Sequence, residues 1–319
     1  MGFVPFLFAA VLLGIVPTAQ AQPYPAKPVR IIVPFAPGGG SDFIGRFTAQ
    51  RLTDALGKQV IVENRPGAGG LLGIEVGVKS DADGYTLVLI ASSYTVNPAL
   101  YTLKFDPVTD VTPIVQISQG PMLVVAGPKL AAKSLKELIA LAKAKPGQLS
   151  FASAGQGSIT HMAAEYFANV AGIKMSHIPY KGTGPALTDT IGGQTDLFFS
   201  STATSLPHVK AGRLRALAVT TAKRLPTEPG VPTIAESGYP SYDVPLWHGL
   251  IGPKGLPKPI VERLNGEVVK ILKLKETGEQ LQSDGVSPAG GSAAQFGKRI
   301  AAEIALWKKV VATTGVKAE

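Results

Sequence analysis

The sequence predicts an α/β protein built from two domains with mostly parallel sheets. Apolar runs of strand length alternate with segments that have helical length and helical spacing of apolar residues, a pattern typical of βαβ units. A strand followed by a glycine-rich loop and a helix occurs twice, at residues 29–56 and 149–170. The chain of 319 residues is also longer than one compact core usually requires, which favours two domains.

The first 21 residues are expected to form a signal peptide. Their apolar run, residues 6–16, is too short to span a bilayer, and Ala19-Gln20-Ala21 is typical of a cleavage site. No Lys or Arg precedes this run, so either the amino terminus alone supplies the positive charge or the true start lies upstream. The sequence has no cysteine, which excludes a lipid-anchor cysteine and disulfide bonds. We therefore expect a soluble, exported protein of residues 22–319 in the periplasm.

The first glycine-rich loop follows the expected strand at 29–33 and precedes an amphipathic helix that reaches Leu56. Its sequence is Pro37-Gly38-Gly39-Gly40-Ser41-Asp42. Consecutive glycines let the backbone approach a ligand closely, and a helix start offers unpaired N–H groups and a positive dipole end. This layout predicts an anion site. Because its charge opposes an anion, Asp42 is expected either to cap the helix or to receive a ligand ammonium or hydroxyl group.

The second glycine-rich loop, Ser153-Ala154-Gly155-Gln156-Gly157-Ser158, follows an expected strand at 149–152. Ile159-Thr160-His161 then begins a helix. At the third position of that helix, His161 is more typical of a side chain that braces the loop by a hydrogen bond than of a proton-transfer group. The two loops can face each other in the fold.

The remaining strands and helices are predicted from short apolar runs and from helix caps. The other strands are expected at 60–63, 86–90, 122–126, 175–179, 195–199 and 214–219. Ser134-Leu135-Lys136-Glu137 is a capping box, and Pro146-Gly147 ends the helix that it begins. Two amphipathic helices near the carboxyl end have apolar stripes that are expected to pack on a sheet, Ile260, Leu264, Val268 and Leu272 in the first and Phe296, Ile300, Ile304, Trp307 and Val311 in the second.

Composition and motifs favour small-molecule binding over catalysis or nucleic-acid binding. The 31 Lys and Arg against 22 Asp and Glu give a formal net charge of +9, but the basic residues are scattered rather than gathered in a stripe with aromatic residues. The charge therefore indicates either a solvated basic surface or a modest attraction for small acids. Neither loop has a dinucleotide or P-loop spacing, and the four histidines lack metal-ligand spacing. We expect no nucleic-acid partner, cofactor, metal ion or enzymatic activity.

Several polar and aromatic residues remain open to two interpretations. Ser92, Ser93, Thr95 and Asn97 follow a strand end, where they can line a pocket or make turn and cap hydrogen bonds. Asp196, after Gly192-Gly193-Gln194-Thr195, can bind a ligand amine or water, or can cap. Arg65 is expected to pair with backbone or with an acidic neighbour rather than with a ligand. Phe35, Tyr94 and Trp247 can be either pocket walls or core residues.

Motifs distributed over nearly the whole chain after residue 21 carry a more specific signal. They are Val33-Pro34-Phe35-Ala36-Pro37-Gly38-Gly39 with Asp42, Val62-Glu63-Asn64-Arg65-Pro66-Gly67-Ala68-Gly69-Gly70, Asp83-Gly84-Tyr85-Thr86-Leu87, Asn97-Pro98-Ala99-Leu100-Tyr101, Ala154-Gly155 and Gly157-Ser158 with His161, Pro179-Tyr180-Lys181-Gly182 with Pro185-Ala186-Leu187, and Trp247 before Gly249 and Pro253. In this order they resemble the Bug (TctC-type) solute-binding proteins of tripartite tricarboxylate transporters.

The resemblance implies a two-lobed periplasmic binding protein of the Venus-flytrap type, with two α/β domains and a ligand cleft between them. It implies that residues 22–120 plus 222–319 form lobe 1, that residues 121–221 form lobe 2, and that hinges lie at the two crossings. Carried over, the binding loops are Phe35, Pro37, Gly38, Gly39, Gly40 and Ser41 in the first lobe and Ala154, Gly155, Gly157, Ser158 and Thr160 in the second.

The function expected from the resemblance is capture of a small carboxylated solute: a dicarboxylate, a tricarboxylate, an acidic amino acid or an aromatic acid. The partners expected are this ligand and the membrane permease subunits of a tripartite tricarboxylate transporter. Two alternatives are a receptor that feeds a periplasmic sensor protein and an exported enzyme that acts on a carboxylated metabolite. Further candidate ligand-binding residues are Asp42, Ser92, Ser93, His161 and Asp196.

Overall fold

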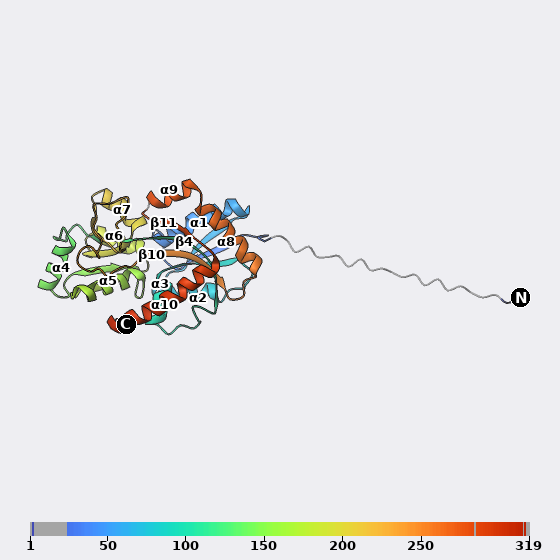
Figure 1. The fold of residues 1–319 in the computed structure, drawn as a ribbon, viewed down its shortest axis with the longest axis horizontal. Coiled ribbons are helices and arrows are strands. Elements are labelled where there is room, and N and C mark those ends of the chain that lie inside the picture. The colour runs from blue at the N-terminus through green and yellow to red at the C-terminus, as the bar shows by residue number, and fades with distance from the viewer. Residues whose placement is uncertain (1, 3–23, 284, 315, 317–319) are drawn as a thin grey trace.

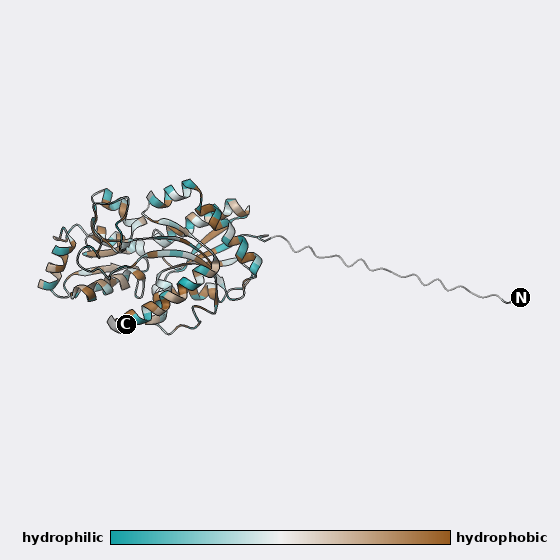
Figure 2. Cartoon of the chain, viewed as in Figure 1, coloured by the Kyte–Doolittle hydropathy of each residue, from teal (hydrophilic) through white to brown (hydrophobic). Residues whose placement is uncertain are grey.

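The computed structural model describes residues 24–314 except 284, together with residues 2 and 316. The expected signal peptide at 1–21 lies outside the described residues, apart from Gly2. The described chain forms two mixed sheets with helices packed on them (Figure 1). Figure 2 shows hydrophilic and hydrophobic residues alternating along these helices, as expected for helices that pack on a sheet by one face. Among the described helices, none combines the length and the apolar character needed to cross a membrane.

The first sheet has six strands in the order β11-β4-β10-β3-β1-β2. The strands are β1 (Val29–Val33), β2 (Val60–Asn64), β3 (Thr86–Ala91), β4 (Val111–Gly120), β10 (Leu246–Pro253) and β11 (Ser287–Gly290). The helical elements that accompany it are α1 (Gly40–Leu56), η1 (Ala68–Gly70), α2 (Leu71–Val78), α3 (Ser93–Leu100), α8 (Lys258–Leu272), α9 (Lys275–Ser283) and α10 (Ala293–Thr314).

The second sheet has five strands in the order β7-β6-β8-β5-β9. The strands are β5 (Met122–Ala126), β6 (Ser150–Ser153), β7 (Ser176–Pro179), β8 (Leu197–Ser201) and β9 (Arg215–Val219). Its helices are α4 (Leu135–Ala144), α5 (Ile159–Ala171), α6 (Thr183–Ile191) and α7 (Thr202–Lys210). The predicted cap of α4 is confirmed, since Ser134 Oγ accepts a hydrogen bond from the Glu137 N–H at 3.2 Å.

The prediction of mostly parallel sheets is wrong. The pairs β1–β2, β1–β3, β6–β7 and β6–β8 are parallel, but β10 and β4 in the first sheet and β5 in the second pair antiparallel with their neighbours. The physical reason is that β4 passes into β5 with only Pro121 between them and the chain returns through β10, so β5 and β10 each enter a sheet from the side that faces the other sheet. They therefore run opposite to strands that end at that side, β8 in the second sheet and β3 in the first.

The segment that returns from β9 to β10 packs on the second sheet. The Ile234 N–H donates to the Val219 carbonyl at 3.0 Å, and the buried Tyr242 hydroxyl donates to the Ala163 carbonyl of α5 at 2.7 Å. The chain enters the first sheet again at Leu246, the first residue of β10.

The predicted packing of the two amphipathic carboxyl-end helices is confirmed. Leu264, Val268 and Leu272 of α8 are buried in the core of the first sheet. In α10, Phe296, Ile300 and Ile304 are buried beside Trp247 of β10, whereas Trp307 is buried in the cluster that also contains the core of the second sheet. Because each fully buried large apolar side chain contributes about 1.5–3 kcal/mol, α10 stabilises both sheets.

Candidate ligand-binding site

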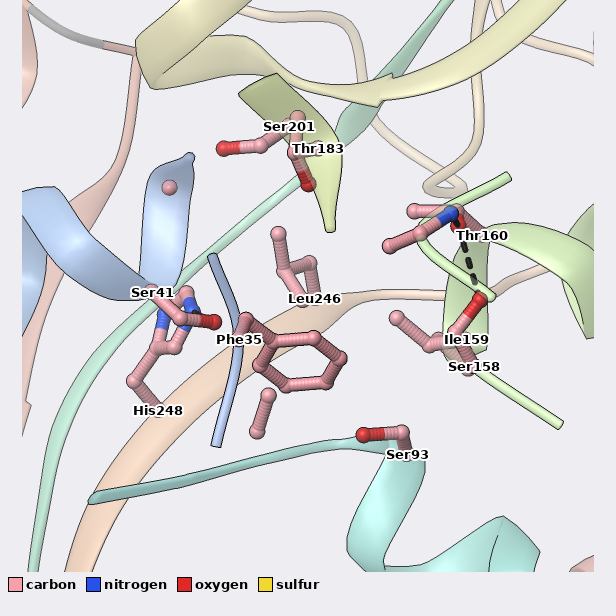
Figure 3. Close-up of a pocket in the computed structure, with 13 residues that line it drawn as sticks. Phe35, Ser41, Ser93, Ser158, Ile159, Thr160, Thr183, Ser201, Leu246 and His248 are labelled. Atoms are coloured by element: carbon pink, nitrogen blue, oxygen red, sulfur yellow. Dashed lines mark hydrogen bonds between the residues drawn. The ribbon is translucent and has the colours of Figure 1, made fainter. Parts of the chain in front are cut away.

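A pocket lies where the carboxyl ends of strands from both sheets meet (Figure 3). It is lined by Phe35, Gly40, Ser41, Ala91, Ser93, Ala154, Ser158, Ile159, Thr160, Thr183, Ser201, Leu246 and His248.

Five helices begin at this pocket. Gly40 and Ser41 are the first residues of α1, Ser93 is the first of α3, Thr183 is the first of α6, and Ser158 and Ser201 are the N-cap residues of α5 and α7. Each helix start has N–H groups without an intrahelical partner and the positive end of a dipole. The pocket therefore has a positive potential that favours an anion, and this potential comes from backbone rather than from Lys or Arg side chains.

The second glycine-rich loop is held from behind by side chains. The N–H of Ala154 donates to Thr160 Oγ1 at 2.8 Å, and that of Gly155 donates to Ser153 Oγ at 3.1 Å. The Gly157 N–H donates to His161 Nδ1 at 3.2 Å, so His161 braces the loop. These three amides are already hydrogen-bonded. The Ser158 and Thr160 hydroxyls lie 2.9 Å apart, so one donates to the other, and one hydroxyl hydrogen is left for a ligand together with the first amides of α5.

His161 acts as an acceptor because it is neutral. Its ring stacks on that of His177, with 3.9 Å between the ring centroids. Burial, together with the neighbouring His177, lowers the pKa of His161 to about 3, and burial lowers the pKa of His177 to about 4. Both rings are uncharged near neutral pH, so the lone pair of His161 Nδ1 remains available to the loop.

The first glycine-rich loop is held by Asp42. One carboxylate oxygen accepts the Gly38 N–H and the Arg46 Nε–H, each at 3.0 Å, and the other accepts the Asn64 side-chain amide at 2.9 Å. Burial alone would raise the pKa of Asp42, but the hydrogen bonds from Arg46, Gly38 and Asn64 together lower it below its usual 3.8. Asp42 therefore stays ionised with both oxygens occupied. It braces the loop rather than capping the helix as one alternative expected, because the N-cap of α1 is Gly39 and no side chain makes a cap hydrogen bond there.

A hydroxyl–imidazole–hydroxyl chain reaches the pocket from the first sheet. Ser41 Oγ lies 3.1 Å from His248 Nε2, and His248 Nδ1 lies 3.2 Å from Ser118 Oγ. Burial lowers the pKa of His248 to about 3, so its ring is neutral and carries one hydrogen. If the hydrogen is on Nε2, His248 donates to Ser41 and the Ser41 hydroxyl can donate to a ligand. In the other tautomer, Ser41 donates to His248 and can only accept.

Ser201 brings a hydroxyl from the second sheet to the start of α1. Its Oγ is buried and has no hydrogen-bond partner within the described part of the chain. A Cβ added at Gly40 would lie only 2.8 Å from Ser201 Cβ and even closer to Ser201 Oγ. Only glycine fits at position 40 in this arrangement, and the unpaired Ser201 hydroxyl is available to a ligand.

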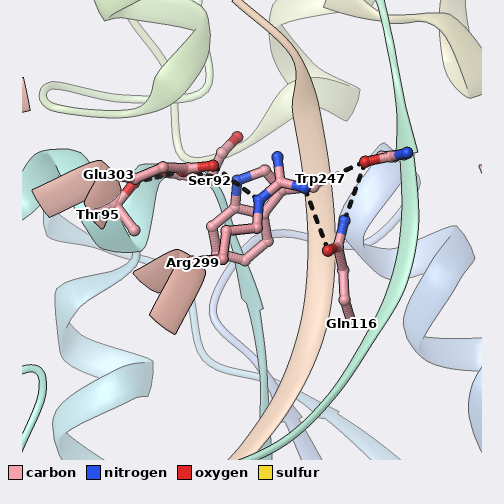
Figure 4. Close-up of polar contacts among 7 residues, drawn as sticks. Ser92, Thr95, Gln116, Trp247, Arg299 and Glu303 are labelled. Carbon is pink, nitrogen blue, oxygen red and sulfur yellow. Dashed lines mark hydrogen bonds and ion pairs between the residues drawn. The ribbon is translucent and has the colours of Figure 1, made fainter. Parts of the chain in front are cut away.

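The far side of the pocket is fixed by a polar network around Glu303 of α10 (Figure 4). One Glu303 oxygen accepts the Trp247 Nε1–H at 2.8 Å and the Thr95 hydroxyl at 3.2 Å, and the other accepts the Arg299 Nε–H at 2.8 Å. Trp247 lies between the pocket residues Leu246 and His248, so the network holds β10 and the start of α3 in place. Ser92, also drawn in Figure 4, has a buried hydroxyl without a described partner.

Seven of the sixteen predicted site residues line the pocket together: Phe35, Gly40, Ser41, Ser93, Ala154, Ser158 and Thr160. The other nine do not line it: Pro37, Gly38, Gly39, Asp42, Ser92, Gly155, Gly157, His161 and Asp196. Asp196 lies away from the pocket, because it precedes β8 and the pocket residue Ser201 is at the other end of that strand. The Asp196 carboxylate accepts both the N–H and the hydroxyl of Ser150.

Six lining residues were not predicted: Ala91, Ile159, Thr183, Ser201, Leu246 and His248. Thr183 and Ser201 do have a local signal, since each stands where a strand gives way to a helix, as the glycine-rich loops do. Of the other residues with two interpretations, Tyr94 and Trp247 are core residues. As expected, Arg65 pairs with the acidic neighbour Glu63. The described residues contain no group of three or more side chains of the kind that hold a metal ion.

Two α/β halves joined by shared strands, with a pocket of helix starts between them, define a two-lobed solute-binding protein. Residues 44–316 match the model of the tripartite tricarboxylate transporter family receptor (TctC). The chain therefore belongs to this family of periplasmic solute-binding proteins.

Individual relatives agree with this family over almost the full chain. Protein BugT of Bordetella pertussis (strain Tohama I) is 39% identical over 307 residues, which cover 95% of this chain and 94% of BugT. The structure of R. palustris Rpa4515 with adipate has a TM-score of 0.89 and 35% identity, and the match covers 92% of this chain and 99% of that chain. MatC from Rhodopseudomonas palustris with bound malate has a TM-score of 0.87 and 29% identity, and the match covers 90% of this chain and 100% of that chain.

Proposed function

We propose that the protein captures a small carboxylated solute in this pocket and delivers it to the permease subunits of a tripartite tricarboxylate transporter. The observation that carries the proposal is the convergence of five helix starts with the Ser and Thr hydroxyls that line the pocket. Helix-start amides and hydroxyls together can solvate a carboxylate without a cationic side chain. The adipate and malate bound to two structural relatives support this ligand class, and the family description supports the transporter.

We infer that the protein binds its ligand without transforming it, and that residues 1–21 direct its export and are then removed. The receptor role of the family supports binding rather than catalysis. The lobes divide at Pro121 and near residue 245, where the chain passes between the sheets. Ligand binding closes the lobes, which is supported by the backbone hydrogen bond from the Ala36 N–H to the Lys181 carbonyl at 3.1 Å across the two halves.

Thermal melting of the purified protein, unfolded and refolded to remove any bound ligand, tests this function. The panel contains dicarboxylates, tricarboxylates and aromatic acids. At a hundredfold excess over its Kd a ligand adds about 2.7 kcal/mol, which at about 2–4 °C per kcal/mol predicts a rise in Tm of several degrees. No rise with any acid contradicts the proposal.

Two matched variants locate the site. Both Gly40 and Gly266 lie in helices, but an added Cβ collides with Ser201 at position 40 and meets nothing within 4 Å at position 266. Gly40→Ala is expected to abolish or strongly reduce the ligand-induced rise in Tm, whereas Gly266→Ala keeps it. If the ligand raises the Tm of Gly40→Ala as much as that of the parent protein, the ligand does not bind in this pocket.

A further inference from the structure

Ser118 is a buried hydroxyl that reaches the pocket only through His248. It lies on β4 directly opposite His248 of β10, so the two side chains share one face of the first sheet. Ser118 is 0% exposed, and its Oγ lies 3.2 Å from His248 Nδ1. On the other side of the ring, Nε2 lies 3.1 Å from Oγ of the pocket residue Ser41 (Figure 3). Ser118 does not line the pocket, but it can act on Ser41 through the ring.

The position of the imidazole hydrogen decides which hydroxyl hydrogens have an acceptor. Because His248 is neutral, its ring carries one hydrogen, on either Nδ1 or Nε2. With the hydrogen on Nε2, Ser118 donates to Nδ1, the ring donates to Ser41, and the Ser41 hydrogen points into the pocket. With the hydrogen on Nδ1, the ring donates to Ser118, whose own hydrogen then has no other acceptor in the described part of the chain.

Burial of Ser118 disfavours the second arrangement. A buried donor without an acceptor has lost its hydrogen bond to water and has gained none in exchange. Ser41 imposes no such demand, because it faces the pocket, where water or a ligand can complete its hydrogen bonds in either arrangement. One unsatisfied buried donor corresponds to a preference of about 5- to 150-fold for the hydrogen on Nε2.

We propose that Ser118 is a positioning residue, which holds the His248 hydrogen on Nε2 and thereby makes Ser41 a hydrogen-bond donor toward the ligand. The inference rests on the proposed function and deepens it, because it states that the ligand presents an acceptor at Ser41. An ionised carboxylate can only accept hydrogen bonds, so it matches a hydroxyl that is fixed as a donor. Ser41 also lies in the first turn of α1, whose first amides are donors as well.

The tautomer can be measured directly by NMR of the purified protein with ¹⁵N-labelled histidine. A ring nitrogen that carries hydrogen and one that does not have well-separated ¹⁵N shifts. The chain has four histidines, and the signals of His248 are those that His248→Leu removes. At pH 7 we expect the hydrogen on Nε2, whereas a hydrogen on Nδ1 overturns the inference.

Two substitutions of Ser118 test the cause. In Ser118→Ala either tautomer leaves Nδ1 unpaired, so we expect His248 shifts intermediate between the two forms. Ser118→Thr keeps the hydroxyl and should restore the Nε2 form. A merely structural role of Ser118 would change the Tm without moving the hydrogen, so parent-like His248 shifts in Ser118→Ala contradict the inference.

Ligand binding is linked to the tautomer in Ser118→Ala, because only the Nε2 form lets Ser41 donate. Saturating malate, adipate or citrate should therefore restore the Nε2 shifts of this variant, and Kd measured by calorimetry should rise about twofold. If an acid binds Ser118→Ala while the His248 shifts stay intermediate, Ser41 is not a donor to the ligand and the inference is wrong, although carboxylate capture stands. If none of the three acids binds the parent protein at millimolar concentration, the carboxylate function fails, and the role of Ser41 fails with it.

Discussion

Substitution of Gly69 by alanine is expected to weaken ligand binding although Gly69 does not line the pocket. Gly69 lies in η1 beside the first sheet, with φ 61° and ψ 20°. A Cβ at this position would lie closer than 3.0 Å to the carbonyl oxygen of Gln156, in the glycine-rich loop of the second sheet. Gly69→Ala therefore obstructs the contact between the two halves without altering any group that faces the ligand.

The expected change in Kd for Gly69→Ala follows from two separate free-energy costs. Alanine in the left-handed region costs about 1 kcal/mol, and that cost applies to the folded protein whether or not ligand is bound. Overpacking against Gln156 adds about 1–3 kcal/mol, and this cost applies only where the halves are in contact. If binding requires that contact, Kd rises about 5- to 150-fold.

Gly57 supplies a matched control. It has φ 64° and ψ 20°, nearly the backbone conformation of Gly69, but an added Cβ meets nothing within 4 Å. Gly57→Ala should lower the Tm without ligand by a few degrees and leave Kd unchanged in calorimetry. Equal affinities for Gly69→Ala, Gly57→Ala and the parent protein would refute the argument that ligand binding brings these two loops together.

Three further substitutions have defined outcomes. Asp42→Asn should lower the free energy of unfolding in urea by about 1–3 kcal/mol at pH 7. Since the folded-state pKa of Asp42 lies below 3.8, this difference is full above that value and disappears as the pH falls through the folded pKa; a pH-independent difference would contradict the role of its charge. Ser158→Ala, which removes the N-cap that accepts the His161 N–H, should cost about 1 kcal/mol, measured as a lower Tm, whereas Ser158→Thr should retain most of the stability. His248→Leu leaves Ser41 without its imidazole partner and should raise Kd for a dicarboxylate about tenfold or more; an unchanged Kd would show that the hydrogen bond does not orient Ser41.

The sequence pattern predicted those parts of the site that are formed by residues close together in the chain. The two glycine-rich loops were identified because a strand, a small-residue turn and a helix start follow one another within a short stretch of chain. Thr183 and Ser201 occupy equivalent places after β7 and at the end of β8, but they lack a run of glycines and were not identified. The same geometric rule, applied to every strand end, would have identified both.

Other parts of the site depend on pairings that no local pattern specifies. His248 lies on β10, which pairs antiparallel with β3 and β4 after a return of the chain from the second sheet. Its neighbour Trp247 points into the core, and alternation along a strand places His248 on the other face, toward Ser41. The parallel-sheet prediction was wrong for the same reason, because direct passage from β4 to β5 is a property of the whole fold rather than of either strand.

The glycines that made the loops recognisable are also used for approach between the two halves of the molecule. A Cβ at Gly184 would lie 2.8 Å from the Pro37 carbonyl oxygen, and one at Gly39 would lie 3.1 Å from Thr183 Cβ. Backbone from one half therefore contacts backbone from the other at the rim of the pocket, while hydroxyls at helix starts line its interior. Glycine motifs thus describe how the two halves approach each other, whereas the side chains that face into the pocket include the less conspicuous serines, threonines and His248.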